Sequence, residues 1–370
     1  MLRRILTIAT AAALSACGPV EPTESVPGAG YEGTPPVGSA MALDPVGVWT
    51  WVPLSDTTCG DGSSTGLGVR RGTSNDLLVF LDGGGACWSY ETCVLKTAFD
   101  RHFDEAMFQA EKADFFPGSI LDPQALPSSF RSANLVFVPY CTGDVHGGDR
   151  VTTYSLPLGL DPKTWHHRGH ANVMAFLKRL KATFPAVDRL VVAGSSAGGF
   201  GSLANYEAFR WYWPHAAGYL VDDSGPTLVG ADISSTLRDA WYGSWNLGAS
   251  LDRFCTGCRS DMSAGFAAIA RNHPADRIAF VSHVEDPVMT AFFASADFHA
   301  DLDQLEAARF RAANTRVFYE WGVDHMLLTP LVKWTGTGTY VASHSTGGVS
   351  LDVWLERMLS GDPAWVTAKP

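Results

Sequence analysis

One short segment, residues 190–201 (Leu-Val-Val-Ala-Gly-Ser-Ser-Ala-Gly-Gly-Phe-Gly), constrains the fold of this chain more than any other. An apolar, β-branched run leads into residues 194–198, which fit the pattern G-x-S-x-G, and a helix-like segment (202–211) follows. A strand that turns sharply into a helix at such a serine needs glycine on both sides, because a Cβ there would crowd the strained serine backbone. The segment therefore predicts a strand–turn–helix unit that lifts the Ser196 hydroxyl above a sheet.

Short apolar runs of this kind recur along the chain, and helical patterns separate them. Each run is rich in Val, Leu, Ile and Phe and lacks regular polar alternation, which is typical of parallel strands covered on both faces. The alternation predicts an α/β fold with a doubly wound, mostly parallel sheet. Residues 226–275 fit it poorly, and we expect a cap insertion there. The runs are 77–81, 135–139, 190–193, 219–221, 278–282 and 317–321, and the clearest helical patterns are 165–184, 291–314 and 351–359.

The N-terminus has the features of an export signal. Residues 1–17 combine two arginines, an apolar run too short to remain in a bilayer as a helix, and the ending Leu-Ser-Ala-Cys, which resembles a bacterial lipobox. Residues 18–42, rich in Pro, Gly and Ser, are typical of a flexible tether, which leaves 43–370 as one domain. We expect an exported protein whose Cys17 carries the lipid that anchors it to the cell envelope, in the outer membrane, on its periplasmic or its surface face.

Charge and cysteine content narrow the partners and the compartment. The formal net charge is −11, which argues against nucleic acid as a partner, and we expect a monomer. Beside Cys17 the chain has six cysteines, an even number that suggests three disulfides in an exported protein. The sequence leaves the pairing open. A zinc role for the Cys-x-x-Cys at 255–258 is disfavoured because no second Cys-x-x-Cys follows at ligand spacing, and a redox role because no thioredoxin-like sequence surrounds it. Short loops favour Cys87 with Cys93 and Cys255 with Cys258, and Cys59 and Cys141 remain.

Downstream residues supply partners for a serine nucleophile, which needs a histidine base and a carboxylate that orients it. In α/β-hydrolases these follow the serine in the order acid, then histidine. Asp286 follows the strand-like run 277–282, and His325 follows the run 315–321. Because such folds place their chemistry in loops after strand ends, we predict Asp286 as the acid and His325 as the base. The alternative acids are Glu285, Asp222 and Asp223.

A glycine-rich loop after the strand-like run 77–81 predicts an oxyanion hole. Residues 82–88 read Asp-Gly-Gly-Gly-Ala-Cys-Trp, similar to the HGGG-type loop of esterases. We expect the N–H groups of Gly84, Gly85 and Ala197 to hold a tetrahedral oxyanion. A phosphate loop is disfavoured because no Gly-Lys-Ser/Thr follows. Two further candidates, for substrate binding, are Trp88 and Asp144.

Taken in order, five motifs make the chain resemble the pectin acetylesterase/Notum family of carboxylesterases over about residues 45–335. The resemblance implies an α/β-hydrolase fold and a Ser/Asp/His triad without metal or cofactor, which falls on Ser196, Asp286 and His325. It also places the family's glycine loop on Gly84 and Gly85. The motifs are residues 81–88, 138–144, 168–169, 194–199 and 222–225.

These observations lead to one expected function and two alternatives. We expect a serine carboxylesterase that removes acetyl or other short acyl groups from a carbohydrate or another small ester through an acyl-enzyme. The first alternative is another hydrolase, such as a lipase, a polyester depolymerase or a peptidase. The second is a non-catalytic binding lipoprotein with the same fold.

Overall fold

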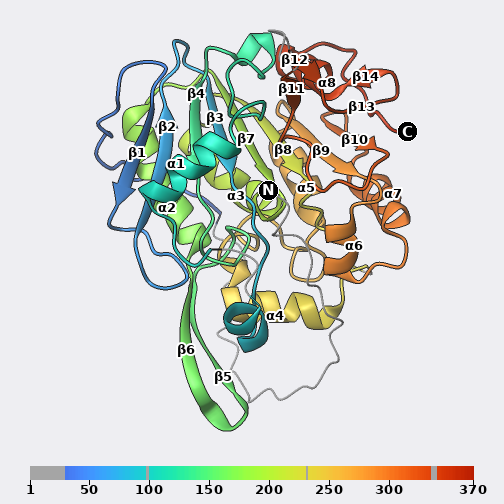
Figure 1. Cartoon of the computed structure of the whole chain (residues 1–370). Helices are drawn as coiled ribbons and strands as arrows, with labels where there is room; N and C mark the ends of the chain where they lie inside the picture. The colour runs from blue at the N-terminus through green and yellow to red at the C-terminus, as the bar shows by residue number, and fades with distance from the viewer. Residues whose placement is uncertain (1–29, 97–99, 231, 335–339) are drawn as a thin grey trace.

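The structure is a computed structural model that describes residues 30–96, 100–230, 232–334 and 340–370. Cys17 and the predicted export signal lie outside these residues. The centre of the molecule is an eight-stranded sheet in the order β1-β2-β4-β3-β7-β8-β9-β10 (Figure 1). β2 is antiparallel to both β1 and β4, and all other neighbours are parallel. The predicted α/β-hydrolase-like, mostly parallel sheet is therefore confirmed.

All six apolar runs are strands of this sheet. The strands of the sheet are β1 (Trp49–Leu54), β2 (Thr65–Arg70), β3 (Leu77–Leu81), β4 (Asn134–Val138), β7 (Arg189–Ser195), β8 (Ala217–Asp223), β9 (Arg277–His283) and β10 (Thr315–Glu320). The α-helices are α1 (Glu105–Asp114), α2 (Gly169–Thr183), α3 (Ala197–Tyr212), α4 (Ser235–Trp245), α5 (Ala264–Asn272), α6 (Pro287–Phe293), α7 (Phe298–Arg309) and α8 (Leu351–Ser360). None of those in the described parts of the chain has the length and apolar character needed to cross a bilayer.

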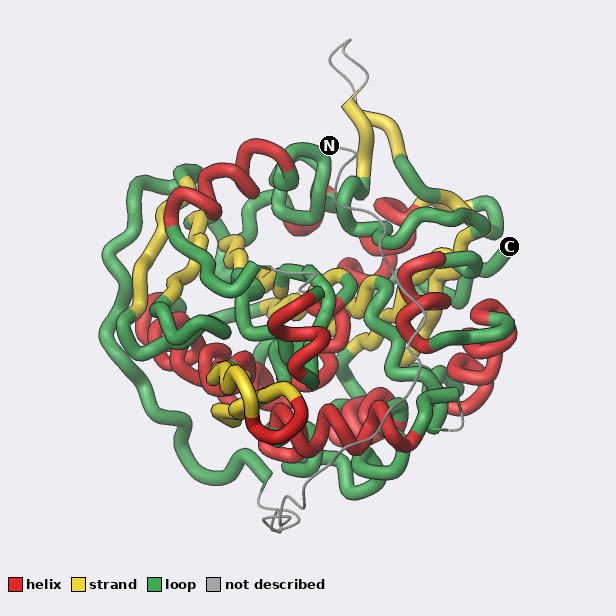
Figure 2. Tube along the Cα trace, turned by 60° about the horizontal axis from the view of Figure 1, so that its bottom comes forward, coloured by secondary structure: helices red, strands yellow, loops and turns green. Residues whose placement is uncertain are grey.

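Helices cover both faces of the sheet, so each strand contributes to two cores (Figure 2). Val79 and Leu81 of β3 belong to the core that includes side chains of α2 and α3. Leu78 and Phe80 belong to the core that includes side chains of α1 and α8. Successive strand residues point to opposite faces, and because both faces are buried the strands have no polar alternation.

Two expected helices have different limits in the structure. The pattern 165–184 begins as strand β6 (Leu160–His167), which pairs with β5 (Arg150–Leu156) in a hairpin that projects from the body (Figure 1). The pattern 291–314 is divided between α6 and α7. Ala294, with a left-handed backbone, ends α6, and Asp297 caps the start of α7.

Four short strands lie outside the sheet and were not predicted. β11 (Val332–Trp334) and β12 (Tyr340–Ala342) form a ribbon that stands out from the body in Figure 2. β13 (Ser345–Thr346) pairs with β14 (Val349–Ser350) just before α8.

The described part of the predicted tether, residues 30–42, is docked on the domain and is not a free linker. The indole N–H of Trp211 donates to the carbonyl of Gly33 at 2.9 Å. Tyr31 and Met41 pack against the core that contains α2 and α3. The composition suggested flexibility, but these apolar side chains give the segment a surface to bury.

Three disulfides join the six cysteines in the pairs that the short loops favoured. Cys87–Cys93 and Cys255–Cys258 close short segments, and Cys59–Cys141 links residues 82 positions apart. The predicted disulfides are therefore confirmed for the described residues.

Candidate active site

Ser196 lies at the sharp turn between β7 and α3. Its φ is 56° and its ψ is −120°, a backbone conformation that residues other than glycine rarely adopt. A Cβ on Gly198 would lie 1.9 Å from the carbonyl oxygen of Leu81, and one on Gly194 would lie 2.1 Å from that of Gly198. Only glycine fits at these two positions, so the turn has the geometry of a nucleophile elbow.

Asp286 and His325 form a hydrogen-bonded pair. Nδ1 of His325 lies 2.7 Å from Oδ2 of Asp286, whose side chain is fully buried. The other carboxylate oxygen accepts the N–H groups of Val288 (2.8 Å) and Met289 (3.0 Å) at the start of α6. Because a carboxylate only accepts, Nδ1 carries the hydrogen and Nε2 presents its lone pair. That Nε2 is buried and has no hydrogen-bond partner among the described residues.

Two of the alternative acids lie away from this imidazole. Glu285 is exposed, although it is adjacent to Asp286 in the chain. Asp222 is fully buried, and its Oδ1 accepts the N–H of Gly225 at 3.1 Å. Within the part of the chain that the structure describes, neither has a hydrogen bond or ion pair with His325.

Asp223, the third alternative, has a positioning role that the sequence did not reveal. Its carboxylate accepts the hydroxyl of Ser195 (2.6 Å) and the N–H groups of Leu327 and Leu328 (2.9–3.1 Å). Burial raises the pKa of Asp223, and these hydrogen bonds oppose the rise. The side chain ties the segment that follows His325 to the end of β8. No local pattern predicts the contact with Leu327 and Leu328, because these residues are 104 and 105 positions from Asp223.

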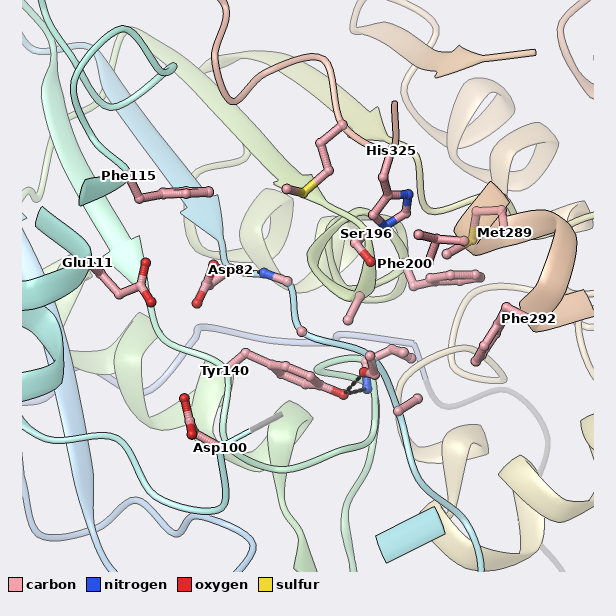
Figure 3. A pocket seen from close by; sticks show the side chains of 18 of the residues that line it. Asp82, Asp100, Glu111, Phe115, Tyr140, Ser196, Phe200, Met289, Phe292 and His325 are labelled. Carbon is pink, nitrogen blue, oxygen red and sulfur yellow. Dashed lines mark hydrogen bonds between the residues drawn. The ribbon is translucent and has the colours of Figure 1, made fainter. Parts of the chain in front are cut away.

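Ser196 and His325 line one cavity of about 460 Å³ (Figure 3). Gly84, Gly85 and Ala197, the predicted oxyanion donors, also line it. Gly84 has φ 148° and Gly85 has φ 100°, values that favour glycine. Within the described residues, the N–H groups of these three residues donate to no protein acceptor. The cavity therefore brings together the serine, the imidazole and a set of open backbone donors.

Tyr140 and His146 hold the glycine loop in place. The hydroxyl of Tyr140 donates to the carbonyl of Gly85 at 2.8 Å, and Nε2 of His146 lies 2.9 Å from the carbonyl of Asp82. Burial raises the pKa of Tyr140 well above its ordinary value and lowers that of His146 to about 4. The tyrosine thus keeps the proton that it donates. Both supports were missed, because they come from a loop about 60 residues downstream.

The wall of the cavity has an apolar part and an acidic part. In Figure 3, Phe200, Met289 and Phe292 lie on one side of Ser196. The acidic side chains lie on the other side. Desolvation raises the pKa of Asp82 well above its ordinary value, and the charge of Glu111 adds to the rise. These acidic residues are Asp82, Asp100 and Glu111.

Trp88 and Asp144, predicted to bind substrate, are not among the residues that line the cavity of Ser196 and His325. Trp88 packs behind the wall, with its ring centroid 6.0 Å from that of Phe292. Asp144 is fully buried, accepts the N–H of Gly169 at the start of α2 at 2.8 Å, and has its pKa raised to about 6 by burial. Its other carboxylate oxygen accepts the hydroxyl of Thr142 at 2.6 Å, so both oxygens of Asp144 have protein partners.

The segment 226–275, expected to cap the site, contributes no described residue to the cavity lining. Its Trp241 lies 5.6 Å from Phe292 and stacks on Trp245 at 5.0 Å, measured between ring centroids. The segment supports the apolar wall from behind.

Comparison of the sequence with known proteins identifies its family. The sequence model of the pectinacetylesterase family matches residues 51–276. The chain is 33% identical to the palmitoleoyl-protein carboxylesterase notum1 of Xenopus laevis over 154 residues, which are 40% of this chain and 30% of that protein. It is 29% identical to pectin acetylesterase 4 of Arabidopsis thaliana over 180 residues, which are 47% of this chain and 42% of that protein.

A further relative lacks activity according to its name. It is the inactive palmitoleoyl-protein carboxylesterase notum1b of Danio rerio, 35% identical over 106 residues, which are 27% of this chain and 71% of that protein. The chain thus covers less than half of the first two relatives. The family model, however, matches more than half of the chain. The chain therefore belongs to the pectinacetylesterase family, as its motifs indicated.

Proposed function

We propose that this protein is a serine carboxylesterase in which Ser196 is the nucleophile, His325 the base and Asp286 the partner of the base. The observation that carries the proposal is one cavity lined by Ser196 and by a histidine whose Nδ1 is bonded to a buried carboxylate. Ser196 Oγ attacks the acyl carbon and its proton passes to Nε2 of His325. The imidazolium then returns that proton to the departing alcohol. Water hydrolyses the acyl-enzyme by the same route.

The glycine loop supplies the electrostatic part of this mechanism. As the acyl carbonyl becomes tetrahedral, its oxygen gains negative charge. The N–H groups of Gly84, Gly85 and Ala197 are proposed to bind that oxygen, and each such donor lowers the activation barrier by about 3 kcal/mol. No metal is needed for this step, because the charge is met by backbone dipoles.

We propose acetyl or another short acyl group on a carbohydrate or other small ester as the substrate. A relative named pectin acetylesterase 4 supports this class. The carboxyl groups of Asp100 and Glu111 in the cavity wall favour a neutral sugar over a polyanionic one, because like charges repel.

A longer acyl chain is the second candidate, and the cavity itself favours it. About 460 Å³ is within the range of pockets for drug-sized ligands and is more than an acetyl group needs. Phe200, Met289 and Phe292 offer an apolar wall for methylene groups. Relatives named palmitoleoyl-protein carboxylesterases agree with this reading.

Two measurements test the proposal. A fluorophosphonate probe should label the wild-type protein at Ser196 and leave the folded Ser196→Ala variant unlabelled. That variant should also lose at least about a thousandfold in kcat/KM at unchanged Tm. A folded wild-type protein without label would identify a non-catalytic binding protein. Nitrophenyl esters of increasing chain length then decide between the substrates: a maximum at two to four carbons supports the short-acyl class, and one above eight supports the other.

We propose in addition that the protein is exported and anchored to the cell envelope, as a monomer, through a lipid on Cys17. The three disulfides support export, because they form in oxidising compartments. Cells fed a labelled fatty acid should incorporate it into the wild-type protein and not into a Cys17→Ser variant. Equal labelling of both would contradict the anchor.

A further inference from the structure

A second cluster of ionisable side chains lies at the ends of β9 and β10. His283 is the last residue of β9, Glu320 is the last residue of β10, and His344 precedes β13, which lies beside β10 (Figure 1). One ligand atom from each residue lies within 4.8 Å of the others. Oε2 of Glu320 is 2.7 Å from Nδ1 of His344 and 3.8 Å from Nδ1 of His283.

His283 has an unsatisfied imidazole. The residue is 3% exposed, and neither of its ring nitrogens has a hydrogen-bond partner among the described residues. Buried polar groups without partners are rare in native proteins, since each costs the free energy of its lost hydration. An imidazole that faces a carboxylate and a second imidazole in this way is suited to a metal ion.

The hydrogen bonds of His344 point to the same conclusion. Its Nε2 lies 3.1 Å from the carbonyl oxygen of Pro330, which only accepts, so Nε2 carries the hydrogen. In a neutral ring, Nδ1 then presents its lone pair to the carboxylate of Glu320. Two acceptors that face each other repel, and a cation between them removes this repulsion. Metal-binding histidines also commonly donate their other N–H to a backbone carbonyl. Protonation of His344 would also satisfy this pair, but it would leave His283 without any partner.

We propose that His283, Glu320 and His344 bind a zinc ion. Two imidazoles and one carboxylate form a ligand set that zinc accepts, with water in the fourth position. With bonds of about 2.0–2.1 Å, tetrahedral ligand atoms lie about 3.3 Å apart. The observed separations of 2.7 and 3.8 Å fall on either side of that value, so small side-chain shifts are sufficient. The site departs from the metal-free expectation that came with the family resemblance.

A second group of possible metal ligands among the described residues is not proposed as a metal site. Cys87, Cys93 and His167 are also close together, but the two cysteines form a disulfide and offer no thiolate.

The position of the zinc site gives it a structural role. His283 lies three residues before Asp286, and Glu320 lies five residues before His325. The ion would link the strand ends from which both loops start and attach them to the segment that contains His344. It takes no part in the ester chemistry, so its binding is measured by metal content and stability.

The first experiment measures zinc on the purified full chain after chelation, dialysis, addition of zinc and gel filtration. We expect about one zinc per chain for the wild type and less than about a tenth for His283→Gln and His344→Gln. The matched control is His273→Gln, because His273 pairs with Glu207 at 2.9 Å without a second histidine, and it should keep its zinc. Zinc should raise the Tm of the wild type and the control by several degrees and leave that of the two variants unchanged. A wild type without zinc, or variants that retain it, would overturn the proposal.

A second experiment needs no variant and so is independent of whether the variants fold. Cobalt(II) added to the metal-free wild type should give visible absorption stronger than that of aqueous cobalt, saturating at one equivalent and disappearing on addition of zinc. Absorption that never exceeds that of free cobalt would overturn the site.

Discussion

The hydrogen bonds of Asp286 explain why this carboxylate, and not its neighbour, pairs with His325. One of its oxygens is occupied by two N–H groups at the start of α6, and the other faces Nδ1 of His325. Glu285, one residue earlier, has the same charge but lies at the surface. The sequence left the choice between the two open, because the directions of adjacent side chains are known only once the backbone conformation is known.

Replacing Asp286 with Asn should lower kcat by about ten-thousandfold while Glu285→Gln changes it less than about twofold. The amide can leave His325 in the wrong tautomer and removes the charge that stabilises the imidazolium. The measurement is steady-state hydrolysis of nitrophenyl acetate, with circular dichroism to verify folding. A comparable loss in Glu285→Gln would show that the acid is misassigned.

His167 should make the protein less stable in mild acid. Burial lowers its pKa from an ordinary value near 6.5 to about 3. Between these pKa values the unfolded chain binds a proton that the folded chain excludes, so stability is lost as the pH falls below about 6.5. Between pH 7 and pH 5 this one residue lowers the free energy of unfolding by about 2 kcal/mol.

Urea unfolding of the wild type and His167→Gln at the two pH values measures this cost. The variant should lose about 2 kcal/mol less between pH 7 and pH 5 than the wild type does. Identical pH dependence in both proteins would show that His167 does not resist protonation.

At the scale of elements, the central strands were predictable and the peripheral ones were not. Each of the six apolar runs is buried on both faces by helices, so its composition alone identifies it. β5 and β6 pair only with each other and are largely exposed, so their composition lacks that signal. The helical pattern that predicts α2 also includes Trp165, which belongs to β6. This side chain is apolar and buried because it packs against Gly60, not because it lies on a helix.

The turn at Ser196 depends on glycine where two elements touch, and Gly198→Ala should disrupt it. The new Cβ would lie 1.9 Å from the carbonyl oxygen of Leu81, which is backbone and cannot move without β3. We expect a loss of about 3 kcal/mol or more in unfolding free energy, together with loss of activity.

The matched control for that substitution is Gly243→Ala within α4, where a Cβ would meet nothing within 4 Å. It should increase stability by about 0.5–1 kcal/mol, because alanine favours a helix. Equal effects of the two substitutions would contradict the close approach at the elbow.

At the scale of the whole molecule, the Cys59–Cys141 disulfide closes a loop with a sequence separation of 82. By loop-closure entropy, this disulfide should stabilise the folded protein by about 4.5 kcal/mol, compared with about 2 kcal/mol for Cys255–Cys258, whose separation is 3. Paired Cys→Ala substitutions should therefore destabilise the protein more when they remove the long-range bond. Urea unfolding of both variants is the test, and a larger loss from the short-range bond would contradict the chain-entropy account.

The amino-acid sequence by itself determined the parallel strands, the glycine-flanked turn at Ser196 and the order of Ser196, Asp286 and His325 along the chain. These features depend on local apolar runs and on backbone conformations that only glycine permits. Only the tertiary structure decided which carboxylate faces the imidazole, that Asp144 caps a helix, and that His283 and His344 meet at Glu320. Such contacts arise because parallel strands bring their carboxyl ends to one edge of the sheet, where residues far apart in sequence become neighbours.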